Sequence, residues 1–148
     1  MGEEEPVRSG IRVCRAEDAE VVWRFDDHDD NVETLRFGPH GRWLASTDTS
    51  GRVCAWDLAR GEKTLDHRYP RQASGVVFTP DGRALATSGS RGASDWWVDL
   101  WALEDQRSLS SLGPLPSRLR LAISLDGRWL AKPGVSRGAC YAATDADK

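Results

Sequence analysis

The sequence lacks the features that mark membrane, secreted or nucleic-acid-binding proteins. It has no long apolar run, and its mean hydropathy of −0.53 argues against a helix that crosses a membrane. The first residues, 1–6, are acidic and polar, whereas a secretory signal needs a basic start and then an apolar stretch. The net charge is only −3 with both signs mixed, so no basic face for nucleic acid is expected. These observations favour a cytoplasmic protein that binds neither membrane nor nucleic acid.

Cysteine is scarce and badly spaced for cross-links or metal. Cys14, Cys54 and Cys140 are an odd number of thiols, lie far apart and form no C-x-x-C pair. A disulfide framework or a zinc site is therefore not expected. We expect these side chains to act as small apolar groups in or near strands.

Catalytic and metal-binding patterns are weak. The segment 134–138 matches the G-x-S-x-G pattern of a nucleophile elbow at Ser136, but no histidine follows it, so a turn between two strands is the better interpretation. Clustered carboxylates in the segment 26–30 suit hard cations, yet their spacing matches no calcium loop. The sequence predicts neither an enzyme nor a bound metal or cofactor.

What the sequence does contain is an internal repeat. Three segments align at offsets of about 41 and 45 residues, within the 20–50-residue range of repeat proteins: Phe37-Gly-Pro-His-Gly-Arg-Trp-Leu-Ala45, Phe78-Thr-Pro-Asp-Gly-Arg-Ala-Leu-Ala86 and Ile123-Ser-Leu-Asp-Gly-Arg-Trp-Leu-Ala131. A second feature recurs at the same period, since Ala55-Trp-Asp-Leu58 is matched by Leu100-Trp-Ala-Leu103. The period predicts several copies of one structural unit.

One unit reads as four short antiparallel strands. The expected strands in the first full unit are 32–37, 43–47, 52–56 and 63–67, and each is separated from the next by a turn containing glycine. Glycine adopts positive φ at little cost, which suits tight hairpins. No segment shows a sustained helical period with caps, so the fold class is all-β.

A period of this length, four strands per unit and a tryptophan that ends the third strand resemble the WD-repeat β-propeller family. The resemblance covers about residues 9–148, and Trp56-Asp57 is the dipeptide that favours this family over other propellers. It implies blades of four antiparallel strands and a protein-binding scaffold without catalysis.

In that family each blade is tied together by a buried network of histidine, serine or threonine, aspartate and tryptophan. The residues that the resemblance places in it are His28, Ser46 (or Thr47) and Trp56 in the first full unit, and Asp95 and Trp101 in the second. The sequence departs from the pattern at Ser50, which stands at the first unit's aspartate position with Asp48 two residues before it. It departs again at Tyr69, which stands at the second unit's histidine position with His67 two residues before it. No unit keeps the whole set.

The register divides the chain unevenly. After an acidic tail, residues 1–8, come a half blade at 9–26, full blades at 31–68 and 73–112, and a half blade at 118–143. The first half blade holds a third and fourth strand, and the last holds a first, a second and perhaps a third. Propellers have typically 4–8 blades. The chain is therefore expected to be a fragment, a homo-oligomer that shares strands between copies, or an open arc with exposed edges.

Function is predicted only as a class, with no named partner. Trp96 and Trp97 lie in one expected strand beyond a loop that contains Arg91, and tryptophan and arginine are favoured in contact hot spots, so these three are candidate contacts for a protein partner. The alternative for these side chains is that both faces of this strand pack between blades.

For the function of the whole chain, the main alternative to a scaffold is an accessory or sensor segment, since such blades in GC-rich bacteria resemble parts of large signalling kinases or NTPases. A hydrolase acting through Ser136 is the third.

Overall fold

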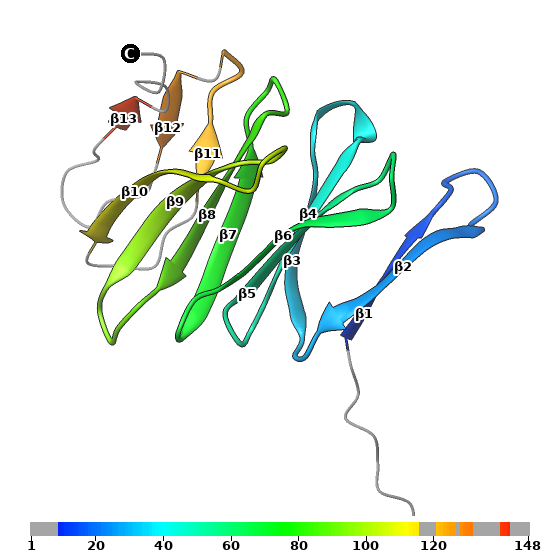
Figure 1. Ribbon diagram of the computed structural model, residues 1–148, viewed down its shortest axis with the longest axis horizontal. Coiled ribbons are helices and arrows are strands. Elements are labelled where there is room, and N and C mark those ends of the chain that lie inside the picture. Colours follow the sequence, from blue (N-terminus) through cyan, green and yellow to red (C-terminus); the bar gives the residue numbers. More distant parts are fainter. Residues whose placement is uncertain (1–8, 116–120, 127, 132–139, 143–148) are drawn as a thin grey trace, which may run out of the picture.

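The computed structural model describes residues 9–115, 121–126, 128–131 and 140–142, and it shows a row of small antiparallel β sheets (Figure 1). Its strands are β1 (Ser9–Cys14), β2 (Val21–His28), β3 (Val32–Phe37), β4 (Trp43–Asp48), β5 (Arg52–Asp57), β6 (Glu62–Arg68), β7 (Gln72–Phe78), β8 (Ala84–Ser90), β9 (Trp96–Ala102), β10 (Ser108–Leu115), β11 (Ala122–Ile123), β12 (Trp129–Ala131) and β13 (Cys140–Ala142). Within the described part of the chain, the only helical element is a short 3-10 turn at Pro39–Gly41.

The strands form four sheets in chain order. The N-terminal pair is β1–β2, the first complete sheet is β3–β6, the second complete sheet is β7–β10, and the C-terminal sheet is β11–β13. Within each sheet every strand pairs with the next along the chain, and Figure 1 shows the sheets fanning side by side like consecutive blades. The expected fold class, all-β with four-stranded blades in an incomplete propeller, is confirmed.

The turn between the first two strands of each unit explains why the repeated motif was visible in the sequence. In the second complete sheet Asp81 Oδ1 accepts hydrogen bonds from the Thr79 hydroxyl (2.6 Å) and the Arg83 amide (3.0 Å). In the C-terminal sheet Asp126 makes the same pair of contacts to Ser124 and Arg128. These aspartates close the hairpin from within, as side chains of short polar residues do in turns.

The core lies between the sheets, not inside any one of them. Every residue of β4 and of β8 is buried, because each of these strands has a neighbouring sheet on both faces. The cluster between the two complete sheets combines one set of residues from the first sheet with another from the second: Trp43, Ala45, Val53, Ala55 and Leu65 with Tyr69, Ala73, Val76, Phe78, Leu85 and Leu103. The N-terminal pair packs on the other face of the first complete sheet, and β11 on the other face of the second.

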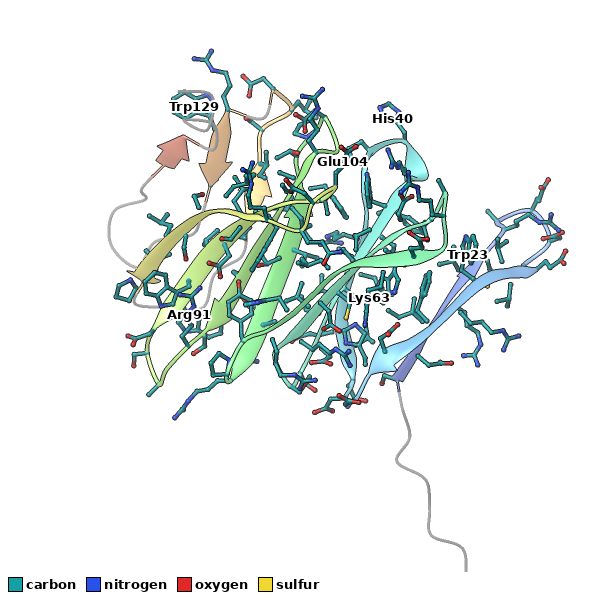
Figure 2. The ribbon with its side chains drawn as sticks, viewed as in Figure 1. Trp23, His40, Lys63, Arg91, Glu104 and Trp129 are labelled. Atoms are coloured by element: carbon teal, nitrogen blue, oxygen red, sulfur yellow. The ribbon has the colours of Figure 1, made fainter. Side chains whose placement is uncertain are left out.

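The arc has two rims, which position the functional candidates differently. We call one the turn rim, made of the β3–β4, β5–β6, β7–β8 and β9–β10 turns; His40 and Glu104 mark it in Figure 2. We call the other the network rim, made of the β4–β5 and β8–β9 loops and the connections between the sheets; Arg91 marks it. Both rims are built from loops on rigid sheets, the usual place for binding residues.

Candidate interaction surface

A buried hydrogen-bond network ties the first complete sheet to the end of the N-terminal pair. His28, the last residue of β2, is fully buried, with Nδ1 2.8 Å from Asp48 Oδ2 and Nε2 2.5 Å from Ser46 Oγ. A neutral ring that donates from Nδ1 to the carboxylate accepts the serine proton at Nε2, so one tautomer satisfies both contacts. The structure thus brings His28 and Ser46 together.

Asp48 is the residue that closes this network. Its Oδ1 accepts from the Ser50 amide (2.9 Å), the Ser50 hydroxyl (2.6 Å) and the Arg52 amide (3.0 Å). Burial by itself opposes ionisation of this carboxyl, but the hydrogen bonds from Ser50 and His28 outweigh burial and lower the pKa of Asp48 below its usual value. One carboxylate therefore holds both the β4–β5 turn and His28.

Trp56 belongs to this cluster through packing. Its ring stacks on Phe25 with centroids 4.6 Å apart and meets the His28 ring edge-on at 6.2 Å. The buried indole Nε1 has no hydrogen-bond acceptor among the residues that the structure describes. Trp56 therefore stabilises the contact between two sheets rather than completing a chain of hydrogen bonds.

The second complete sheet forms a network of different composition. The Tyr69 hydroxyl donates to Asp99 Oδ2 (2.6 Å) and lies 2.7 Å from Thr87 Oγ1, which in turn accepts from Trp101 Nε1 (3.0 Å). Burial, followed by the negative charge of Asp99, raises the pKa of the Tyr69 hydroxyl far above its usual value. Tyr69 therefore stays a neutral donor at the centre of the network.

The aspartate of this second network is Asp99, on β9, and not the Asp95 that the turn position suggested. Asp95 lies exposed in the β8–β9 loop, where its carbonyl accepts from the Arg91 amide. Asp99 is buried, and its Oδ1 accepts from Arg91 Nη2 (2.9 Å) and Ser111 Oγ (2.5 Å). Trp101 is thus placed in the network, but Asp95 is not.

The two networks are related by a compensated exchange at three aligned positions. Tyr69 aligns with His28, and Gly89 aligns with Asp48. A methyl group added at Gly89 would lie only 2.1 Å from the Tyr69 ring, so the ring occupies the space that the Asp48 side chain fills in the first sheet. The hydroxyl then reaches Asp99, whose counterpart in the first sheet is Cys54. Thr87 pairs across the strands with Asp99 as Ser46 pairs with Cys54.

At the surface of the network rim, the charged side chains largely pair with one another. Asp66 accepts from Arg52 (2.7 Å) and from Lys63 (2.8 Å), and Lys63 also contacts Asp27 (3.1 Å). The hydrogen bonds from Arg52, and then from Lys63, lower the pKa of Asp66 well below its usual value. Asp27, and likewise Asp29 through Arg52 and Arg68, therefore serve in ion pairs beside the inward-facing histidine.

Arg91 and Trp97 meet on the network rim, whereas Trp96 lies on the other face of β9. The Arg91 guanidinium lies 4.5 Å from the Trp97 ring centroid, within cation–π distance. Trp97 packs over Gly113, where an added methyl group would approach the indole to 2.6 Å. Trp96 packs with Leu115 and the neighbouring sheet. Of the three candidate contacts, two form one partly exposed pair.

The turn rim carries two adjoining grooves between the complete sheets. One, of about 290 Å³, is lined by Arg42, Trp43, Asp57, Arg60, Glu62, Thr64, Leu103 and Glu104. The other, of about 260 Å³, is lined by Pro39, His40, Arg42, Trp43, Asp81, Gly82, Arg83 and Glu104.

The arginines of these grooves differ in whether they are paired. Arg42 is paired with Asp57 (3.0 Å), and its guanidinium lies over the Trp43 ring, 4.7 Å from the centroid. Arg60 and Arg83 are exposed and form no ion pair with any described residue. Sequence reasoning missed this surface, because its residues come from turns far apart in the chain.

Features for chemistry are few in the described part of the chain. No group of three or more His, Cys, Asp or Glu side chains is placed there to hold a metal ion. Cys54 is buried, and burial raises the pKa of its thiol to about 12, which disfavours the nucleophilic thiolate. Ser136 lies outside the described residues. None of the described helical segments is long and apolar enough to span a bilayer.

Comparison with known proteins finds repeats of one kind. Residues 19–57 match the family "WD domain, G-beta repeat". Human WD repeat-containing protein 36 is 30% identical over 107 residues, which cover 72% of this chain and 12% of that protein. The U3 small nucleolar RNA-associated protein 21 homolog of Schizosaccharomyces pombe is 28% identical over 79 residues, 53% of this chain and 9% of that protein. An uncharacterized WD repeat-containing protein of Deinococcus radiodurans is 30% identical over 88 residues, 55% of this chain and 34% of that protein. This chain thus spans only a minor part of the length of these relatives.

Proposed function

This chain belongs to the WD-repeat family, and on that basis we propose that it is a non-catalytic scaffold that binds a protein partner. Two complete blades hold several loops in fixed relation, which suits recognition of a folded partner without any reaction. WD-repeat proteins in general serve as interaction scaffolds, and the repeat match is what supports this class of function here. The cytoplasm is the compartment in which we place this role.

The observation that carries the proposal is the pair of grooves on the turn rim. Arg60 and Arg83 stand at their edges without an ion-pair partner among the described residues, while Trp43 and Leu103 lie almost fully buried beneath them. Charged groups that are already paired offer a partner little, because the pair must be broken first. Exposed arginines that are not already paired can instead pair with carboxylates of a partner.

The Arg91–Trp97 pair on the opposite rim is a second contact candidate for the same function. Its guanidinium is held in place by Asp99 and by the indole face, so little side-chain freedom is left to lose on binding. Arginine and tryptophan are also the residue types most enriched in contact hot spots. Arg91 is nevertheless engaged within the blade, which makes it the lesser of the two candidates.

The test compares charge reversals on the two rims. The tagged chain captures proteins from an extract of the source organism, and the captured proteins are identified by mass spectrometry. A partner bound through the turn rim is lost from the Arg60→Glu and Arg83→Glu variants but retained by Arg71→Glu, an exposed arginine on the network rim. The reverse pattern would move the contact to the network rim. A set of captured proteins that is the same for all variants would count against a rim-specific partner.

The alternative, an accessory segment of a larger bacterial signalling kinase or NTPase, leads to a different experiment. The much greater length of the relatives is the observation that favours it. Sequencing the genomic region on both sides of the coding segment decides it. A continuous reading frame into a kinase or NTPase domain supports the alternative, and flanking stop codons oppose it.

A further inference from the structure

One face of the first complete sheet is apolar and only half covered. Leu35 and Phe37, on β3, are 46% and 62% exposed. Their counterparts in the second complete sheet are Val76 and Phe78, which are only 4% and 8% exposed. The equivalence follows from strand register, because Phe37 lies opposite Leu44 as Phe78 lies opposite Leu85. Apolar side chains at the same two places in a blade are therefore buried in one sheet and open in the other.

The buried case shows what covers such a face. Phe78 and Val76 pack in one cluster with Trp43 and Ala45 of the preceding sheet. A methyl group added at Gly82 would lie 3.9 Å from the Trp43 indole. The counterpart of Gly82 is Gly41, where an added methyl group would meet no described atom within 4 Å. The space that Trp43 fills beside Gly82 is therefore open beside Gly41.

The uncovered area is two strands wide. The N-terminal pair covers only the outer part of the face, where Ile11 and Phe25 pack against Leu44, Cys54 and Trp56. Within the described residues, β1 pairs with β2 alone, so its other edge has no strand beside it. Two inner strands of a blade, placed beside β1, would both extend this sheet and cover Leu35 and Phe37.

The other end of the arc carries a matching pair of strands. By the repeat, Trp129 and Ala131 of β12 correspond to Trp43 and Ala45 of β4, and Ile123 lies opposite Leu130 as Phe37 lies opposite Leu44. Ile123 packs on the second complete sheet, so Trp129 faces away from it. Trp129 is 50% exposed, and Figure 2 shows it at the far end of the arc from Trp23.

We propose that a second copy of this chain docks at the open face, with β11–β12 of one copy completing the sheet of β1–β2 of the other and Trp129 packing on Phe37. The contact repeats the one that Trp43 makes with Phe78 inside the chain. The proposed contact and the Trp43–Phe78 contact both join a tryptophan to a phenylalanine. The contact between the second complete sheet and the C-terminal sheet is different, because the aligned residues there are Ala84 and Ile123. Such a contact is heterologous and gives a closed ring when the rotation fits.

The ring follows from counting sheets. The described residues of each copy supply two complete four-stranded sheets, the strand pair β1–β2, and the strands β11–β12 of the three-stranded C-terminal sheet. Two copies therefore make about six blades, within the usual range for propellers. In the single chain, β13 holds the edge of β12 that β1 of the second copy would take. β13 pairs with β12 through only three residue positions, whereas β1 is six residues long. This assembly is separate from the rim contacts proposed above and does not depend on them.

The test is the mass of the purified chain by size-exclusion chromatography with light scattering. The proposal expects twice 16.4 kDa for the unaltered chain, and 16.4 kDa for both Phe37→Glu and Trp129→Glu. Leu125→Glu is the control, since this turn residue of the same sheet is 95% exposed and takes no part in the contact. A dimer mass that both variants retain, or that Leu125→Glu abolishes equally, would overturn the proposal.

Mixing the two variants separates a specific contact from general damage. A mixed dimer keeps one unaltered Phe37–Trp129 contact, whereas neither variant alone keeps any. Equimolar mixing should therefore restore part of the dimer, and a mixture that stays at 16.4 kDa would contradict the pairing. Hydrogen exchange of β1 amides in the unaltered chain gives a measurement without substitution. Protection that rises with protein concentration supports the shared sheet, and protection that is independent of concentration refutes it.

Discussion

The sharpest test of the network in the second complete sheet compares two aspartates that lie four residues apart. Asp99→Asn removes the charge of a buried carboxylate that accepts from Tyr69 (2.6 Å), Arg91 (2.9 Å) and Ser111 (2.5 Å). Asp95→Asn makes the same chemical change at an exposed position in the β8–β9 loop. Only the first change should alter stability, because only Asp99 is buried with donors on both oxygens.

The magnitude follows from the contacts. A hydrogen bond to a charged group contributes about 1.5–3 kcal/mol, and an asparagine keeps one acceptor oxygen while it turns an NH₂ group toward a donor. Tyr69 can rotate its proton and accept from that group, and Arg91 is partly exposed, which weakens its ion pair. We therefore expect Asp99→Asn to lower the free energy of unfolding by about 2 kcal/mol, which for a chain of this length lowers Tm by roughly 4–8 °C. Asp95→Asn should stay within about 0.5 kcal/mol of the unaltered chain.

Urea unfolding followed by tryptophan fluorescence measures both variants, since Trp101 reports directly on this network. The midpoint should shift for Asp99→Asn with little change in slope. An equal loss for the two variants would show that the buried carboxylate is not specially placed. A larger loss for Asp95→Asn would reassign the network to the loop.

Three further outcomes are expected. Because the pKa of Asp66 is lower in the folded chain than in the unfolded one, its stabilisation is present above its unfolded pKa of about 4 and is lost as pH falls through the folded value; Asp66→Asn should flatten the decline in stability between pH 5 and pH 2, measured by urea titration at each pH. Gly89→Asp alone forces a side chain into the Tyr69 ring and should cost about 3 kcal/mol or more, but adding Tyr69→His and Asp99→Cys recreates the first network and should recover much of the loss in a thermal melt. Cys54 should resist alkylation by iodoacetamide in the native chain and react only on unfolding, as peptide mapping would show, because its buried thiol has a pKa of about 12.

The repeat predicted the strand order because its signals are local. The hairpin at Asp81-Gly82 needs a short acceptor and a residue that tolerates positive φ, and both are visible in the sequence. Alternation along Trp96–Ala102 likewise puts Trp101 on one face of the strand and Trp96 on the other. Signals of this kind need no knowledge of neighbouring sheets.

The network of the second sheet could not be assigned by matching one motif position at a time. The turn position pointed to Asp95 because it assumes a histidine at position 69. A tyrosine there is longer, so its hydroxyl passes the turn and reaches a carboxylate on the strand itself. The sequence held the signal, since Gly89 opposite the tyrosine and Asp99 two residues before Trp101 both depart from the first unit. The signal can be recognised only when the departures at Tyr69, Gly89 and Asp99 are considered together.

The middle of the arc and its ends differ in how well their apolar side chains are covered. Trp56 has no described hydrogen-bond acceptor for its indole, yet it is buried because Phe25 of the preceding strand pair stacks on it. Stability thus depends on each sheet having a neighbour on both faces, and burial of apolar area outweighs one missing hydrogen bond. Among the described residues, Phe37 and Trp129 have no such neighbour. The covering of a blade's two faces, more than the hydrogen bonds within the blade, therefore determines the stability of the arc. Whatever covers Phe37 and Trp129 should stabilise the two end sheets as well as form the assembly.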